Sequence, residues 1–225
     1  MESGSSTPNV VPGASAGIIG LVLAAGQGTR FDPSGRLNKL MQPLPGGMRV
    51  VDQTIARVRA GVDAVVAVVG ALDSPVAQHL QQLQVPVVLC AQARQGMGHS
   101  VAAGVAATQA ETGWIIALAD MPFVACETVQ ALAAALRAGA PCAVPFFKGV
   151  RGNPVAFQAA WRSTLLSLTG DQGARHLLQQ PGVVQLNVPD PGVLRDVDTP
   201  ADLVGVEIRC RAGSWPVPRP DPGAG

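Results

Sequence analysis

Three aspartates stand where the sequence could place them around a cation. Asp120 closely follows the apolar run 114–118 and precedes Met-Pro, which would fix its carboxylate at the carboxyl end of a strand. Asp196 and Asp198 alternate, so in an extended chain both carboxylates would face the same side. Carboxylates placed in this way suit a hard cation. A second interpretation is that Asp120 caps a following helix and that Thr199 or Asp198 caps the helix opened by Pro200.

Two glycines and two cations follow the first apolar run of the chain. Gly26 and Gly28 allow a tight turn and let backbone N–H groups approach a phosphate closely. Arg30 adds a fixed positive charge, and Lys39 adds a mobile point charge suited to phosphate. The pattern predicts either a phosphate-binding loop or an ordinary strand–loop turn with two surface cations.

Other familiar sites find no support in these motifs. A dinucleotide-binding fingerprint needs a third glycine where Phe31 stands, and the P-loop pattern GxxxxGK[ST] is absent. The four cysteines show no CxxC spacing, so a zinc site is unsupported. No Ser/His/Asp or Cys/His arrangement of a covalent catalyst is evident either.

Two later segments carry residues suited to an anionic substrate. Gly96, Gly98 and Ser100 lie at a predicted helix start, which could contact an anion or a base or could simply be capped. In the segment 149–157, Arg151 and the flexible backbone at Gly152 stand next to a predicted strand. That arrangement suits a second anionic substrate, although Arg151 could also be a solvated surface cation.

These residues need elements that hold them at one edge of a sheet. Continuous β-branched runs alternate with helical stretches, which predicts an α/β fold with a mostly parallel sheet. The predicted strands are 17–23, 64–69, 85–89, 114–118, 142–145 and 183–188, and the predicted helices are 50–60, 75–83, 98–110, 126–137, 158–168 and 173–179. Parallel sheets bind ligands at the carboxyl ends of their strands, where the motifs above stand.

The composition narrows the class of protein. With 225 residues, 48% hydrophobic and 14% charged, the chain fits one folded domain, expected at 17–208 between flexible tails at 1–16 and 209–225. The net charge of +1 argues against nucleic acid as a partner. No apolar run reaches the roughly 18 residues of a membrane helix, and the first residues do not read as a signal peptide. We therefore expect a cytoplasmic protein.

Taken together, the motifs resemble a known family. LAAGxGxR with a following NKL, GMGxS, ADMP, GxRGNPVAF and DxDTPxDL occur in the family order of the MobA-like nucleotidyltransferases, and more narrowly of the molybdenum cofactor cytidylyltransferases. The resemblance implies a three-layer, Rossmann-like (GT-A-like) nucleotidyltransferase fold. This chain departs from the family in a longer loop at 31–37 and in Asn153, where the family usually has His.

The resemblance also assigns roles to residues. Catalysis would rest on Lys39, Arg30 and Asp120, and Mg²⁺ would be held by Asp120 with Asp198 or Asp196, of which Asp198 is favoured. The implied nucleotide-binding residues are Leu23, Ala24, Ala25, Gly26, Gly28, Arg30, Lys39, Gly96, Gly98, Ser100 and Asp120. The implied pterin-binding residues are Arg151, Gly152, Asn153, Asp171 and Gly173, although Asp171 could also cap a helix.

The implied reaction is transfer of CMP from CTP to the terminal phosphate of molybdenum-molybdopterin, with release of pyrophosphate. A molybdoenzyme that receives the cofactor is a further implied partner. Three alternatives stay open at this point: a nucleotidyltransferase with another phosphorylated acceptor, a redox enzyme that uses a nicotinamide cofactor, and a non-catalytic carrier or insertion chaperone for the molybdenum cofactor.

Overall fold

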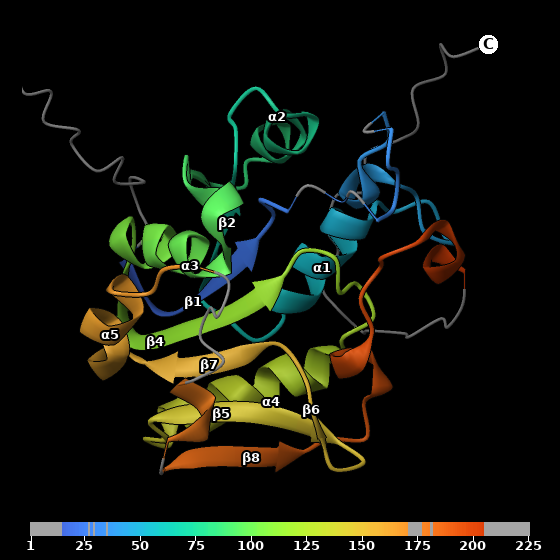
Figure 1. The fold of residues 1–225 in the computed structure, drawn as a ribbon. Coiled ribbons are helices and arrows are strands. Elements are labelled where there is room, and N and C mark those ends of the chain that lie inside the picture. The colour runs from blue at the N-terminus through green and yellow to red at the C-terminus, as the bar shows by residue number, and fades with distance from the viewer. Residues whose placement is uncertain are drawn as a thin grey trace, which may run out of the picture.

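The computed structural model describes residues 15–204, apart from Gln27, Thr29, Gly35, 171–176 and Pro181 (Figure 1). The predicted pterin residues Asp171 and Gly173 lie outside the described residues. So do most of the predicted helix 173–179, the tail up to residue 14 and the tail from 209 onward.

The strands form one mixed sheet. In the described part of the chain they are β1 (Ser15–Leu23), β2 (Ala64–Val69), β3 (Val87–Leu89), β4 (Gln109–Leu118), β5 (Cys142–Phe147), β6 (Val150–Arg151), β7 (Val155–Gln158) and β8 (Val183–Asn187). Their order is β3-β2-β1-β4-β7-β5-β6, with β8 also paired to β5. The half β3-β2-β1-β4 is parallel, as is β5 with β8, whereas β7 is antiparallel to β4 and β5. The predicted α/β fold with a mostly parallel sheet is confirmed.

Helices cover both faces of the sheet, which gives three layers (Figure 1). The described α-helices are α1 (Val50–Arg59), α2 (Pro75–Gln82), α3 (Met97–Ala106), α4 (Cys126–Arg137) and α5 (Arg162–Leu166). Side chains of β1 alternate between the faces: Ile19 and Leu21 pack in the cluster of α3 and α5, whereas Ile18 and Val22 pack with α4 and α1.

Short 3₁₀ turns connect these elements at several places. They are η1 (Lys39–Met41), η2 (Ala93–Gln95), η3 (Ala159–Trp161), η4 (Leu177–Gln179), η5 (Pro191–Leu194) and η6 (Pro200–Leu203). Two of them, η1 and η6, carry or lie next to the charged residues Lys39 and Asp198, and η2 directly precedes the glycine segment that starts at Gly96. Their positions therefore decide whether those residues meet.

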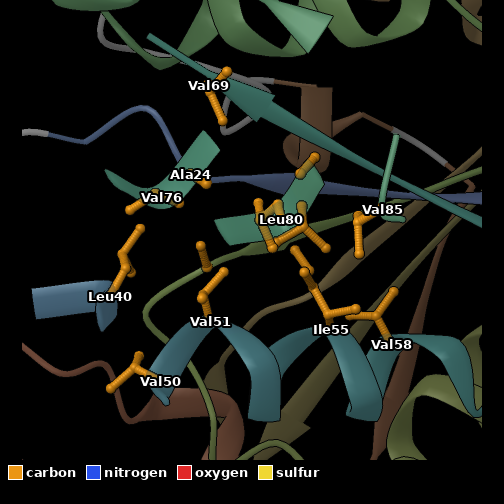
Figure 2. Packing of buried hydrophobic residues seen from close by; sticks show 14 of the residues in the cluster. Ala24, Leu40, Val50, Val51, Ile55, Val58, Val69, Val76, Leu80 and Val85 are labelled. Carbon is orange, nitrogen blue, oxygen red and sulfur yellow. The ribbon is translucent and has the colours of Figure 1, made fainter. Parts of the chain in front are cut away.

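An apolar cluster anchors the turn that carries Lys39. Figure 2 shows Leu40 of η1 in the same cluster as Val76 and Leu80 of α2 and Val51 and Ile55 of α1. Leu40 is only 3% exposed, and burying a leucine of this kind stabilises the fold by roughly 1.5–3 kcal/mol. This packing fixes the backbone beside Lys39 at the edge of the sheet.

Several ends of helices and strands differ from those predicted from the sequence. The strand β1 begins at Ser15, so Ser15 and Ala16, which were assigned to the tail, pair with Gln109 and Ala110. Those two partners were predicted to end a helix, but α3 stops at Ala106.

Thr108 links the end of α3 to β4. The Thr108 hydroxyl donates to the Gly104 carbonyl at 2.8 Å and accepts from the Trp114 indole at 2.9 Å, which ties the helix end to β4. In place of the predicted helix 158–168, the chain forms η3 followed directly by the short helix α5. None of the helices in the described part of the chain has the length and apolar character needed to span a bilayer.

Candidate active site

Three carboxylates converge beyond the end of β4. One oxygen each of Asp120, Asp196 and Asp198 lies within 4.8 Å of the others. Asp120 follows β4, whereas the other two lie in residues 195–198, which form no strand. The Val197 amide donates to the Asp120 carbonyl at 2.8 Å, so the two segments are joined through their backbones. The structure thus brings together the three aspartates singled out in the sequence.

The capping alternatives are decided by the helix starts. The N-cap of α4 is Ala125, and its amide donates to the Asp190 carboxylate at 2.8 Å, so Asp120 does not cap this helix. Thr199, not Asp198, caps η6. Neither carboxylate is therefore used by a helix end.

Asp202 holds the backbone on which Asp198 stands. Its carboxylate accepts from the Thr199 hydroxyl at 2.8 Å, from the Thr199 amide at 2.7 Å and from the Asp198 amide at 3.1 Å. The hydrogen bonds from Thr199, together with that from the Asp198 amide, hold the pKa of Asp202 below its usual value. Asp202 therefore remains an ionised acceptor at neutral pH and fixes the turn after Asp198.

Two cations are paired with these carboxylates. The Lys39 ammonium lies 2.6 Å from Asp120 Oδ2 and 3.1 Å from Asp198 Oδ1. Arg30 Nη1 lies 2.6 Å from Asp198 Oδ2, with 77% of its side chain exposed. Lys39 is only 8% exposed, so it is not the surface cation of the simpler interpretation. Burial lowers the pKa of Lys39, but the hydrogen bonds and charges of Asp120 and Asp198 outweigh it and raise the pKa overall.

The donor set fits a divalent cation. Among the described residues, three carboxylates face two cations, and Asp120 Oδ1 is buried with no hydrogen-bond partner. Asp196 is exposed, yet partial burial of its carboxyl raises its pKa, and the charges of Asp198 and Asp120 add to the rise. An orphaned carboxylate oxygen beside two further carboxylates is the donor set that Mg²⁺ or Mn²⁺ takes.

A cleft of about 600 Å³ opens beside this cluster. It is lined by Leu23, Ala25, Gly26, Ala93, Arg94, Gly96, Met97, Ser100, Leu118 and Asp120. The cleft lies at the carboxyl ends of β1 and β4. There the strand order changes direction, because β2 and β3 lie on one side of β1 and β4 lies on the other. This is the place where open α/β sheets bind ligands.

The predicted glycines differ in what they contact. A side chain at Gly26 would meet no atom within 4 Å, so its backbone faces open space in the cleft. Gly28 has a φ of +63°, and a Cβ there would lie 3.4 Å from Lys39 Cγ, so the loop rests on the lysine stem. Gly98 and Gly152 are required by the chain itself, because a Cβ would lie 2.7 Å from the Thr169 carbonyl oxygen and 2.5 Å from that of Val193.

The longer loop at 31–37 is closed by its own aspartate. The Asp32 carboxylate accepts from the Ser34 amide at 2.8 Å, from the Ser34 hydroxyl at 2.6 Å and from the Leu37 amide at 2.8 Å. These bonds fold the extra residues onto Asp32. The loop therefore returns the chain to Lys39 in spite of its length.

The predicted second-substrate segment packs against η5, which directly precedes the acidic segment 195–198, and it does not line the cleft. The Gly152 amide donates to Pro145 at 2.8 Å, and the Asn153 amide donates to Val193 of η5 at 2.9 Å. Neither these residues nor Arg151 are among those that line the cleft. Arg151 ends β6, and Gly152 and Asn153 lie between β6 and β7, two strands that are not among those predicted from the sequence.

Sequence reasoning missed part of the cleft wall. Arg94 and Met97 are both exposed and line the cleft, as do Ala93 and Leu118. Arg94 stands two residues before Gly96. An arginine so close to the predicted helix start was the signal in the sequence that could have revealed this part of the cleft wall.

The comparison with known families settles the kinship of the chain. Residues 20–186 match the MobA-like NTP transferase domain. The chain belongs to this family. The predicted resemblance and the predicted Rossmann-like fold are therefore both confirmed at the level of the family.

Two curated relatives match this MobA-like chain over nearly their whole length. The purine catabolism protein PucB of Bacillus subtilis is 33% identical over 82% of this chain and 93% of its own. The nicotine blue oxidoreductase of Paenarthrobacter nicotinovorans is 31% identical over 81% of this chain and 92% of its own.

A solved relative shares the fold and has been crystallised with a metal. Rv0371c from Mycobacterium tuberculosis H37Rv is 28% identical, has a TM-score of 0.67 and covers 82% of this chain and 95% of its own. A second structure of Rv0371c is a complex with manganese, with a TM-score of 0.66.

Proposed function

We propose that this MobA-like chain transfers CMP from CTP to the terminal phosphate of molybdenum-molybdopterin and releases pyrophosphate. One observation carries the proposal of nucleotidyl transfer. A cleft bounded by the glycine loop ends at Asp120, where three carboxylates and Lys39 converge. The choice of CTP is supported by the Ala24-Ala25-Gly26 opening, which resembles the cytidylyl branch of the family.

The acceptor needs no activation by a base. A phosphate monoester has its second pKa near 6, so about nine in ten are dianions at neutral pH. An acceptor oxygen attacks the α-phosphorus and forms the new P–O bond, while the bond to the pyrophosphate oxygen breaks and that oxygen keeps the electron pair. The protein therefore has to bring two anions together and offset their charge.

The residues of the site divide this work. The backbone at Gly26 and Gly28 would receive the triphosphate, and Lys39 and Arg30 would offset its charge. Asp120 with Asp198 or Asp196 would hold Mg²⁺, which supplies charge neutralisation at the phosphate oxygens when bound. Gly96, Gly98 and Ser100 would shape the wall that faces the nucleotide, with Leu23, Ala24 and Ala25 opposite.

The second substrate is assigned to the segment beside η5. Arg151, Gly152 and Asn153, with Asp171 and Gly173, would bind the pterin. Asn153 can form hydrogen bonds but does not titrate near neutral pH, so no proton transfer is assigned to it. A single domain that begins at β1 and ends at residue 208, a cytoplasmic location and delivery to a molybdoenzyme complete the proposal.

The test is transfer with purified components. The protein is incubated with Mg²⁺, with each of CTP, GTP, ATP and UTP, and with either molybdenum-molybdopterin or another phosphorylated acceptor. Pyrophosphate and the dinucleotide product are then measured. We expect both products with CTP. Preference for GTP would contradict the choice of base. Pyrophosphate release only with another phosphorylated acceptor would contradict the choice of pterin, and cofactor binding without any transfer would favour a carrier.

The similarity to nicotine blue oxidoreductase favours a second candidate, a redox enzyme that uses a nicotinamide cofactor. The acidic cluster around Lys39 argues for nucleotidyl transfer, because hydride transfer has no use for three convergent carboxylates. Calorimetry separates the two: tight binding of NADPH without Mg²⁺, together with no binding of CTP, would establish the redox candidate.

A further inference from the structure

Both cations of the site occupy the carboxylate oxygens that a metal ion would need. Lys39 is hydrogen-bonded to Asp120 Oδ2 at 2.6 Å and to Asp198 Oδ1 at 3.1 Å. Arg30 is paired with Asp198 Oδ2 at 2.6 Å. Both oxygens of Asp198 and one of Asp120 are thus engaged by Lys39 and Arg30. A divalent cation that takes Asp120 and Asp198 must displace at least part of this arrangement.

Displacement of Lys39 by a metal alone is unfavourable. The lysine is 8% exposed, so its ammonium cannot turn freely into water once it leaves the carboxylates. A divalent cation bound to the same carboxylates would also repel the ammonium at close range. Metal binding by itself therefore separates an ion pair and leaves a buried like charge beside the ion.

A bound triphosphate would remove both obstacles, the separated ion pair and the like charge beside the metal ion. The loop at Gly28 rests on the stem of Lys39, so phosphates bound by this loop would lie within reach of the ammonium. Arg30 follows the same loop and its guanidinium is largely exposed, so it can turn from Asp198 to a phosphate. Once the two cations have this new anionic partner, the carboxylates are released for the metal.

From these contacts we infer that Lys39 and Arg30 form an electrostatic latch on the acidic cluster, which makes divalent metal binding conditional on a bound triphosphate. The inference rests on the proposed nucleotidyl transfer and extends it. Lys39 and Arg30 have two roles in this inference. They pair with the carboxylates when no triphosphate is bound, and they release the carboxylates to the metal ion when the phosphates bind.

The decisive experiment measures Mn²⁺ binding without nucleotide. The paramagnetic resonance signal of free Mn²⁺ is titrated with the wild-type protein, Lys39→Met and Lys148→Met. Lys39 and Lys148 are the only lysines of the chain, and Lys148 is exposed in the turn between β5 and β6, so it provides a matched control. We expect Lys39→Met to bind Mn²⁺ about tenfold or more tightly than wild type, and Lys148→Met to match wild type.

An unchanged or weaker Mn²⁺ affinity in Lys39→Met would overturn the latch. Arg30→Gln keeps the test decisive if Lys39→Met does not fold, because this exposed side chain is not needed for packing. Tighter Mn²⁺ binding by Arg30→Gln supports the latch, and an unchanged affinity contradicts it. Adding Asp120→Asn to Lys39→Met should abolish the gain, and a gain that survives this change would place the ion elsewhere and refute the inference.

The outcome is separate from that of the transfer assay. If Lys39→Met gains Mn²⁺ affinity while the wild-type protein transfers no CMP, the latch stands and the proposed substrates fall. If CMP transfer is observed and Lys39→Met gains no Mn²⁺ affinity, the proposed substrates stand and the latch falls.

Discussion

At the scale of single residues, the site is organised around one buried lysine. Lys39 contacts both Asp120 and Asp198, which approach from segments far apart in the chain. Its ammonium takes the central position between carboxylates that a divalent cation would otherwise share. The same group can therefore join the two carboxylates and, in the proposed function, bind the phosphates.

Replacing Asp120 by Asn tests the proposed catalytic charge. The amide keeps the shape of the side chain but removes the charge that faces Lys39 and the metal. We expect turnover in the CMP transfer assay to fall on the order of 100-fold or more, with an unchanged circular dichroism spectrum. Glu111→Gln, at the exposed opposite end of β4, removes an equal charge and should leave turnover unchanged. Near wild-type turnover in folded Asp120→Asn would refute the proposed role of this residue.

Arg94 offers a second test at the same scale. Its exposed side chain lines the cleft, so it can attract the nucleotide without holding the metal. We expect Arg94→Gln to raise the KM for CTP about tenfold and to change kcat much less. The control is Arg137→Gln, which removes an equal charge from a surface pair with Asp63 outside the cleft lining. A fall in kcat with an unchanged KM would show that Arg94 acts in the transition state instead.

At the scale of elements, continuous apolar runs and periodic helices were predictable, whereas the shortest strands and the polar start of a long strand were not. The strand β2 and the helix α4 match their predicted bounds because each is a continuous apolar or 3.6-periodic run. The strands β6 and β7 have two and four residues around glycine and proline, too few for a period to show. The polar start of β4 was also hidden, because its pairing with Ser15 and Ala16 is a long-range contact.

The candidate site was predictable as a set of residues but not as a geometry. The motifs named Lys39 and all three aspartates. No local pattern could show that Lys39 is buried between Asp120 and Asp198, since this arrangement depends on the sheet order. For the same reason the sequence could not separate glycines that face a ligand from glycines that allow close packing.

That difference between glycines predicts opposite outcomes for two alanine substitutions. Gly152→Ala would place a Cβ 2.5 Å from the Val193 carbonyl oxygen, so we expect the free energy of unfolding to fall by about 1–3 kcal/mol. Gly26→Ala meets no atom within 4 Å, so we expect unchanged stability but weaker CTP binding. Urea unfolding and calorimetry measure the two effects. A Gly26→Ala protein that loses stability and keeps its affinity for CTP would reverse this assignment.

At the scale of the whole molecule, the sheet order joins distant parts of the sequence in one ligand site. The cleft draws on β1 and β4 and on the helix start after η2, and the acidic segment follows η5 near the end of the described chain. Ligands that bridge these parts should stabilise all of them together. The latch adds that metal and nucleotide should do so cooperatively.

This linkage can be measured by thermal unfolding. With saturating CTP and Mn²⁺ together, a ligand at 100 times its Kd adds about 2.7 kcal/mol to the free energy of unfolding. At about 2–4 °C per kcal/mol for a chain of this size, the Tm should rise by roughly 5–10 °C. Because Lys39 and Arg30 block the carboxylates until the triphosphate arrives, the Tm rise with both ligands should exceed the sum of the separate rises. Asp120→Asn should lose this excess, whereas separate rises that simply add would show that the two ligands bind independently.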